Sequence, residues 1–187
     1  MPEPDPNRTV RKWEKRGSRI CSDHRIFQVR EDQVINPRTG NEHAMVVIEC
    51  PDWVNIIALT PEREVVLVEQ YRPGSETVEL EIPGGMMDPG EKDPVATATR
   101  ELQEETGYTG ENARKIGECY ANPAIMNNRV YTILVENCRL TNEVKLDAGE
   151  DITTVLVKAD DLPRLVKEQK IRHSIILAAL QFFALTD

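Results

Sequence analysis

Apolar residues in the first half of the chain fall into short β-branched runs separated by turn residues. The runs predict strands at residues 25–29, 43–49, 53–59, 65–69 and 78–82. Pro, Gly, Asn and Asp at 36–40, 51–52 and 61–62 separate the earlier runs. We therefore expect a β-rich first half, preceded by a flexible arm over residues 1–17.

The pattern changes to helical spacing at Asp93. Asp93 is a good N-cap, Pro94 suits the first helical position, and Gly107 ends the segment. Between them one apolar face repeats, made of Val95, Ala98, Leu102 and Thr106. The sequence therefore predicts a helix between Asp93 and Gly107.

The remaining segments alternate strand-like and helical patterns. Strands are predicted at 115–120, 130–135 and 152–157, and helices at 160–169 and 173–185. This order predicts an α/β (α+β) fold with a mixed β-sheet sandwiched by helices and an N-terminal β-rich extension.

Composition restricts the range of functions. The net charge is −9, although residues 1–30 hold eight Lys and Arg against four acids. An acidic body repels polyanions, so we expect no extended nucleic-acid partner. No apolar run is long enough to cross a membrane and residues 1–12 do not resemble a signal peptide, so we expect no membrane partner and a cytoplasmic location.

The four cysteines lack the spacing of a metal site. Cys21, Cys50, Cys119 and Cys138 include no CxxC pair and have no histidines at zinc-ligand spacing. We expect them to be small buried residues rather than ligands or disulfide partners.

A glycine-rich loop and an acidic helix carry the chemistry. Glu101 and Glu105 stand four residues apart, so they lie on one helical face with Glu104 beside them. Such carboxylates repel one another unless a hard divalent cation binds among them. The Gly84-Gly85 pair lets backbone approach a metal or phosphate. A solvated acidic helix end is the alternative.

Together these residues resemble the signature of the Nudix hydrolases. The matching positions are Gly85, Glu91, Arg100, Glu101, Leu102, Glu104, Glu105 and Gly107, with Tyr108 in the final apolar place. One departure is that eight residues rather than seven separate Glu91 from Arg100. An insertion in the loop before Asp93 leaves the helix intact and changes the spacing between Glu91 and the helix.

The resemblance implies a function and a set of ligands. Glu101, Glu104 and Glu105, with the backbone carbonyl near Gly85, would bind Mg²⁺ or Mn²⁺. Arg100 and Glu91 would hold the cluster in place. The implied reaction is hydrolysis of a nucleoside diphosphate sugar, such as ADP-ribose or GDP-mannose, to a nucleoside monophosphate and a sugar phosphate.

Further matches point to the ADP-ribose and nucleoside diphosphate sugar pyrophosphatase branch. Arg72 ends a strand as a phosphate-facing arginine of that branch does, or is a surface charge. Glu81 is either a substrate contact or a solvent-facing strand residue. Trp53 is either a stacking surface for the base or a core residue. Pro123 and the segment 170–174 are also similar to that branch.

The general base is a second departure from this branch. Asn127 and Asn128 stand where such members often have a glutamate, and asparagine cannot take a proton. Glu150, in an acidic Gly-containing loop, is our candidate, although such loops are usually just solvated. His173 and a metal-bound hydroxide are the other options.

The branch also implies an assembly. Residues 1–50 would form an N-terminal arm and strands used in a homodimer, and residues 51–187 the hydrolase domain. Two alternatives stay open: a Nudix enzyme acting on dinucleotide polyphosphates, a nucleotide pool contaminant or an RNA 5′ end, and a non-catalytic nucleotide-sugar regulator. Intact glutamates disfavour the regulator.

Overall fold

The computed structural model describes residues 9–186, which divide into two compact units. The smaller unit contains the described part of the first fifty residues together with residues 122–127. The larger unit runs over residues 51–121 and from 128 onward. The predicted arm at 1–17 falls partly on residues outside the described range.

The smaller unit is built on a three-stranded antiparallel sheet in the order β1-β2-β3. Its strands are β1 (Glu14–Asp23), β2 (Gln28–Ile35) and β3 (Glu42–Glu49). The prediction that residues 14–17 belong to an arm is wrong, because they pair with the end of β2. The strand predicted at 25–29 also lies later, at Gln28–Ile35. β1 is mostly exposed and polar, so hydrophobicity could not reveal it.

The larger unit contains two sheets. Its strands are β4 (Trp53–Ala58), β5 (Glu64–Arg72), β6 (Thr77–Glu81), β7 (Gly84–Met86), β8 (Tyr108–Tyr120), β9 (Arg129–Leu140) and β10 (Ile152–Lys158). One sheet has the order β7-β4-β9-β8, in which only β4 and β9 are parallel. The other is antiparallel, in the order β10-β5-β6. The predicted mixed sheet is therefore confirmed.

Within residues 9–186, three α-helices accompany these sheets: α1 (Pro94–Thr106), α2 (Leu162–Lys167) and α3 (Ser174–Ala184). The caps of α1 are those predicted. The Asp93 carboxylate accepts a hydrogen bond of 2.9 Å from the Val95 amide, and Gly107 adopts a left-handed φ of 73°. α2 is shorter than the predicted 160–169, because a 3-10 turn (Ala159–Asp161) precedes it.

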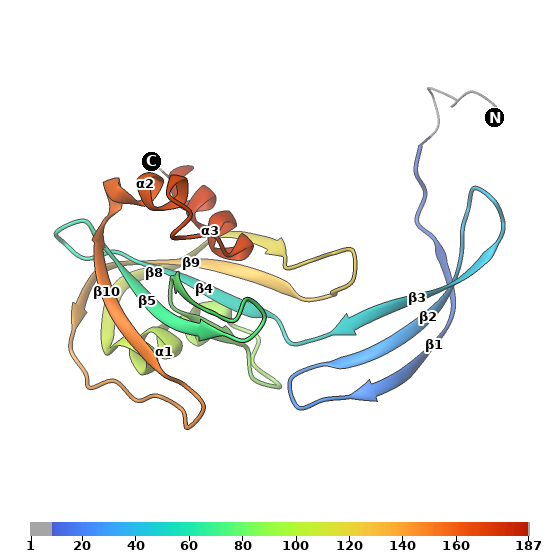
Figure 1. Cartoon of the computed structure of the whole chain (residues 1–187), viewed down its shortest axis with the longest axis horizontal. Coiled ribbons are helices and arrows are strands. Elements are labelled where there is room, and N and C mark those ends of the chain that lie inside the picture. The colour runs from blue at the N-terminus through green and yellow to red at the C-terminus, as the bar shows by residue number, and fades with distance from the viewer. Residues whose placement is uncertain (1–8, 187) are drawn as a thin grey trace. The chain divides into compact units, whose positions relative to one another are not determined.

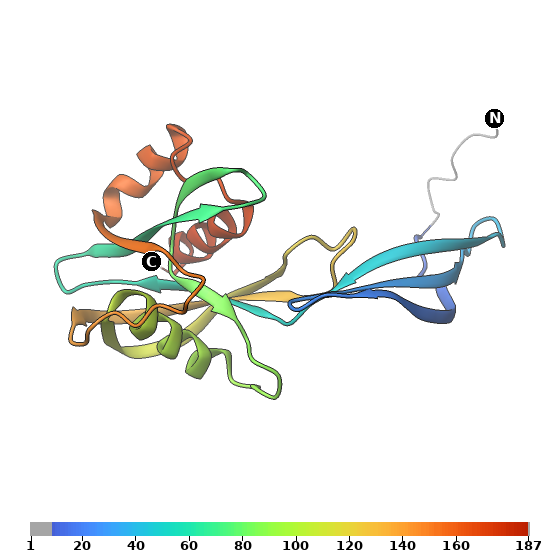
Figure 2. The same ribbon diagram turned by 60° about the horizontal axis from the view of Figure 1, so that its bottom comes forward.

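Strands β4 and β9 are buried on both faces. In β4, Ile56 belongs to the apolar cluster that contains Leu102 of α1. The next residue, Ile57, belongs to the cluster that contains Ile176 of α3. Figures 1 and 2 show α1 and α3 on opposite sides of this sheet. Burial on both faces explains why these strands read as continuous apolar runs, as expected for a parallel pair.

The cysteines follow the prediction only in part. Cys138 is buried in the cluster that contains Leu102, and burial raises the pKa of its thiol to about 11. Cys21, by contrast, is exposed on β1. The expectation that it is buried is wrong, because the sheet of the smaller unit leaves most of β1 accessible.

Close packing of α3 on β8 gives a test of the fold. A Cβ on Gly117 would overlap the ring of Phe182. We expect Gly117→Ala to lower the free energy of unfolding by about 1–3 kcal/mol, since the ring must move. Gly17→Ala is the control, because no atom lies within 4 Å of its Cβ position. Urea unfolding measures both, and an equal effect of the two variants would contradict this packing.

Candidate functional site

Helix α1 places two carboxylates against the glycine pair of β7. Gly85 carries no Cβ, and the space that a Cβ would occupy lies only 2.5–2.8 Å from the carboxylate atoms of Glu101. One turn later, the Glu105 carboxylate accepts a hydrogen bond of 3.1 Å from the backbone N–H of Gly84. The predicted neighbours Gly85, Glu101 and Glu105 thus meet in the structure. A side chain at position 85 would displace the Glu101 carboxylate from this place.

Burial raises the proton affinity of both carboxylates. Glu105 is only 4% exposed, and this burial raises its pKa to about 8. The nearby charges of Glu101 and Glu150 raise it further, while the Gly84 hydrogen bond and Arg72 oppose the shift. Burial likewise raises the pKa of Glu101, with Glu104 and Glu150 adding to the effect and Arg100 opposing it. The site therefore favours a bound positive charge.

Arg100 supplies part of that positive charge. Its guanidinium lies 3.0 Å from the Glu101 carboxylate, 2.9 Å from that of Glu104 and 3.6 Å from that of Glu91. Glu91 also accepts hydrogen bonds from the Thr97 hydroxyl (2.9 Å) and the Asp88 amide (2.8 Å). The extra residue before Arg100 is therefore absorbed without separating Glu91 from the cluster.

Glu150 lies close enough to Glu101 and Glu105 to raise the pKa of each. Its loop is closed by a hydrogen bond of 2.9 Å from the Asp147 amide to the Glu150 carboxylate. This placement brings the predicted base to the acidic cluster. Asn128, by contrast, is fully buried, and its amide atoms have no hydrogen-bond partner among the described residues.

The donor chemistry fits a divalent cation, although the ligands are not yet arranged around one. In the described part of the chain no three acidic, histidine or cysteine side chains are placed to hold a metal ion as they stand. Glu104 is turned toward Arg100 instead. Buried carboxylate oxygens with raised pKa values are nevertheless the groups that a hard cation would stabilise.

Arg72 lines a second feature of the unit, a cavity of about 590 Å³. Its guanidinium binds Glu81 at 2.6 Å. Glu81 is only 1% exposed, so the alternative of a solvent-facing residue is wrong. The cavity is also lined by Glu79, Arg172 and His173. Arg172 binds Glu79, and His173 binds Glu81; the sequence pattern predicts neither pair.

Trp53 begins β4, where it pairs with Met86 and Val130. It is half-buried, and no described residue accepts a hydrogen bond from its buried indole N–H. Stacking on a base stays a prediction for this residue.

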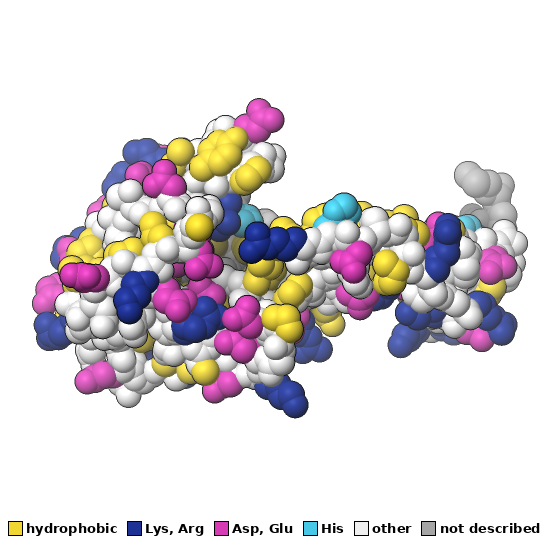
Figure 3. Space-filling view, turned by 90° about the horizontal axis from the view of Figure 1, so that it is seen from below, with side chains coloured by type: hydrophobic (Ala, Val, Ile, Leu, Met, Phe, Trp, Pro, Cys, Tyr) yellow, Lys and Arg dark blue, Asp and Glu magenta, His cyan; other side chains and the backbone are white. Residues whose placement is uncertain are grey.

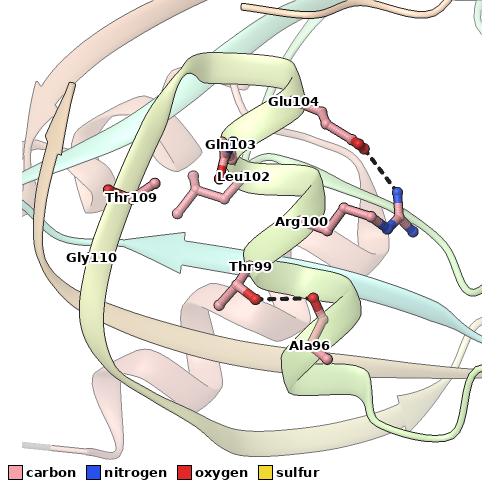
Figure 4. A pocket seen from close by; sticks show the side chains of 8 residues that line it. All are labelled: Ala96, Thr99, Arg100, Leu102, Gln103, Glu104, Thr109 and Gly110. Atoms are coloured by element: carbon pink, nitrogen blue, oxygen red, sulfur yellow. Dashed lines mark hydrogen bonds and ion pairs between the residues drawn. The ribbon is translucent and has the colours of Figure 1, made fainter. Parts of the chain in front are cut away.

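Another cavity, of about 290 Å³, lies beside α1 (Figure 4). Ala96, Thr99 and Gln103 line it, with Thr109 and Gly110 from β8. Glu101 and Glu105 are not part of its wall. Of the predicted site residues only Arg100 and Glu104 reach it, so this cavity contributes little to the acidic cluster.

Comparisons with known proteins agree with this geometry. A family model described as a NUDIX domain matches residues 51–180. An ADP-ribose pyrophosphatase of Bacillus subtilis is 32% identical over 149 residues, covering 79% of this chain and 80% of that protein. A methanol dehydrogenase activator of Bacillus methanolicus is 30% identical and covers 87% and 88%. The solved structure of an ADP compounds hydrolase shares the fold, with a TM-score of 0.83, 18% identity and 95% coverage of each chain.

The raised pKa of Glu105 predicts how stability depends on pH without metal. The folded protein holds this proton up to about pH 8, whereas an unfolded glutamate loses it near 4.5. Stability should therefore fall as pH rises from 4.5 to 8, by roughly 3–5 kcal/mol at most. Glu105→Gln should remove this loss in urea unfolding with a chelator. Glu104→Gln is the control and should retain the slope, since Glu104 is half exposed.

Proposed function

The chain belongs to the Nudix family, in its ADP-ribose pyrophosphatase branch, and from this premise we propose that it hydrolyses the pyrophosphate of a nucleoside diphosphate sugar such as ADP-ribose. The products would be a nucleoside monophosphate and a sugar phosphate. The observation that carries the proposal is the meeting of Glu101 and Glu105 at the Gly84-Gly85 pair of β7, within the electrostatic influence of Glu150.

The proposed cofactor is Mg²⁺, with Mn²⁺ as a substitute. Glu101, Glu104, Glu105 and the backbone carbonyl of Gly85 would hold it, because hard cations prefer oxygen ligands. When bound, the cation would neutralise diphosphate oxygens and lower the pKa of a water molecule. Arg100 then has a positioning role, since it pairs with both Glu101 and Glu104.

The remaining residues bind substrate and move the proton. Arg72 would donate to the diphosphate through guanidinium N–H groups that Glu81 does not occupy. Glu150 would accept a proton from the attacking water, since its charge acts on both buried carboxylates. Trp53 would stack on the base. Glu81, with both carboxylate oxygens engaged by Arg72 and His173, would act through Arg72.

A substrate panel separates this proposal from its alternatives. ADP-ribose, GDP-mannose, UDP-glucose and diadenosine polyphosphates are each incubated with magnesium, and phosphate is measured after phosphatase treatment. We expect turnover of a nucleoside diphosphate sugar. Tight binding without turnover would instead support a non-catalytic regulator. One of the relatives is a methanol dehydrogenase activator, which is consistent with that alternative.

We also propose a homodimer formed through the smaller unit. A three-stranded sheet alone buries little apolar surface, and side chains such as Ile20, Met45 and Val46 are exposed on it. Figure 3 shows hydrophobic side chains at the surface of this sheet. A second copy of the chain would cover them. Light scattering at several protein concentrations tests the dimer, and a monomer throughout would contradict it.

The predicted location in the cytoplasm stays a prediction. Among the residues that the structure describes, no helix is both long and apolar enough to cross a membrane.

Glu105→Gln tests the ligand assignment. The amide keeps the shape of the side chain but cannot offer the charge that a divalent cation requires, so we expect turnover to fall at least about 100-fold. Initial rates with magnesium measure the loss, and circular dichroism checks folding. Near-normal activity in a folded variant would refute the assignment.

Glu150→Gln tests the base. If Glu150 accepts the proton, kcat should fall about 100-fold while KM changes less than about threefold. Asp147→Asn is the matched control, because it lies in the same loop and interacts with Glu150 through its backbone. An unchanged kcat for Glu150→Gln would assign the proton to another group.

A further inference from the structure

One buried carboxylate joins Arg72 to the start of α3. The Arg72 Nε atom lies 3.3 and 3.2 Å from the two oxygens of Glu81, and its Nη2 atom lies 2.6 Å from Oε2. On the other side of the same carboxylate, Nδ1 of His173 lies 2.7 Å from Oε1. A carboxylate only accepts hydrogen bonds, so Nδ1 of His173 must carry the hydrogen.

Glu81 is held in its charged form by these two partners. Burial opposes the charge, yet the hydrogen bonds from His173 and Arg72 lower the pKa of Glu81 below its ordinary value. With 1% exposure and both oxygens engaged, Glu81 has no free edge for a ligand. Its effect on a ligand must therefore pass through its partners, of which Arg72 carries the fixed positive charge.

Arg72 and His173 both face the cavity of about 590 Å³. The Arg72 side chain is 41% exposed and that of His173 33% exposed, whereas the carboxylate between them is buried. The guanidinium is thus fixed along one edge and open along the other. A preorganised open edge suits an oxyanion, because little side-chain entropy is lost on binding.

We propose that His173 is a positioning residue for substrate binding: by donating to Glu81, it fixes the carboxylate that aims Arg72 at the diphosphate. The inference rests on the proposed function, and it assigns to His173 a role other than that of general base. The group recognised is a diphosphate, and the effect belongs to binding rather than to the chemical step.

The neighbouring pair of Arg172 and Glu79 is an example of a contact that only anchors the start of α3 to β6. Arg172 binds Glu79, two residues before Glu81 on β6, at 3.0 Å and also donates to Thr77. This pair ties the same segment to the same strand without touching Arg72 or Glu81. If His173 only anchored α3, its loss would affect stability and would be independent of Arg72.

A double-mutant cycle distinguishes the two roles. His173→Ala should raise KM for ADP-ribose about tenfold and leave kcat within about twofold, as expected for a lost binding interaction. In an Arg72→Ala background the same change should alter KM less than about twofold, because its effect passes through Arg72. An equal tenfold effect in both backgrounds would overturn the proposal.

Two further variants keep the test decisive. His173→Asn can donate to Glu81 from about the position of Nδ1 and should restore KM. The thermal unfolding of each variant separately measures how far His173 stabilises the attachment of α3. Should His173→Ala fail to fold, the nearly isosteric Glu81→Gln replaces it in the cycle. Titration calorimetry measures the affinity for ADP of wild type and His173→Ala without any turnover. If the wild type proved inactive, the proposed function would be refuted, but these affinities would still test the role of His173. Equal ADP affinity in wild type and His173→Ala would also overturn it.

Discussion

The approach of α1 to β7 imposes the constraint on which the site depends. The position of a Cβ on Gly85 lies 2.5–2.8 Å from the Glu101 carboxylate of α1, and that of a Cβ on Gly84 lies against the Val54 carbonyl of β4, so the strand carries no side chain at either place. The consequence is electrostatic: Glu101 and Glu105 are removed from water while they stay close to each other and to Glu150. Such an arrangement is unfavourable by itself and is relieved by a cation or by protons.

The carboxylates of the acidic cluster and those of the cavity wall are paired with cations in different ways. Arg100 is one flexible cation that divides its charge among Glu91, Glu101 and Glu104. On β6, by contrast, each buried carboxylate has dedicated partners, Arg172 for Glu79 and Arg72 with His173 for Glu81. Shared pairing leaves the acidic cluster free to rearrange when a ligand arrives. Dedicated pairing holds the cavity wall in place.

The sequence predicted those features that local chemistry determines. Residues close together in the sequence determine the caps of α1, the spacing of its glutamates and the apolar runs of β4 and β9. The glutamate spacing is part of the family resemblance. It did not predict β1 or β7, since one strand is polar and the other is only three residues long. The link from His173 to Glu81 joins residues 92 positions apart, a pairing that no local pattern reveals.

The parallel pairing of β4 with β9 also bears on how the protein folds. Residues 53–58 pair with residues 130–135, so the centre of the sheet closes a loop of more than seventy residues that includes α1 and both glycines. Contacts this distant along the chain form late and slowly, because the entropy of loop closure opposes them. Partly folded chains in which these strands have not yet met would therefore lack the sheet surface on which α1 packs.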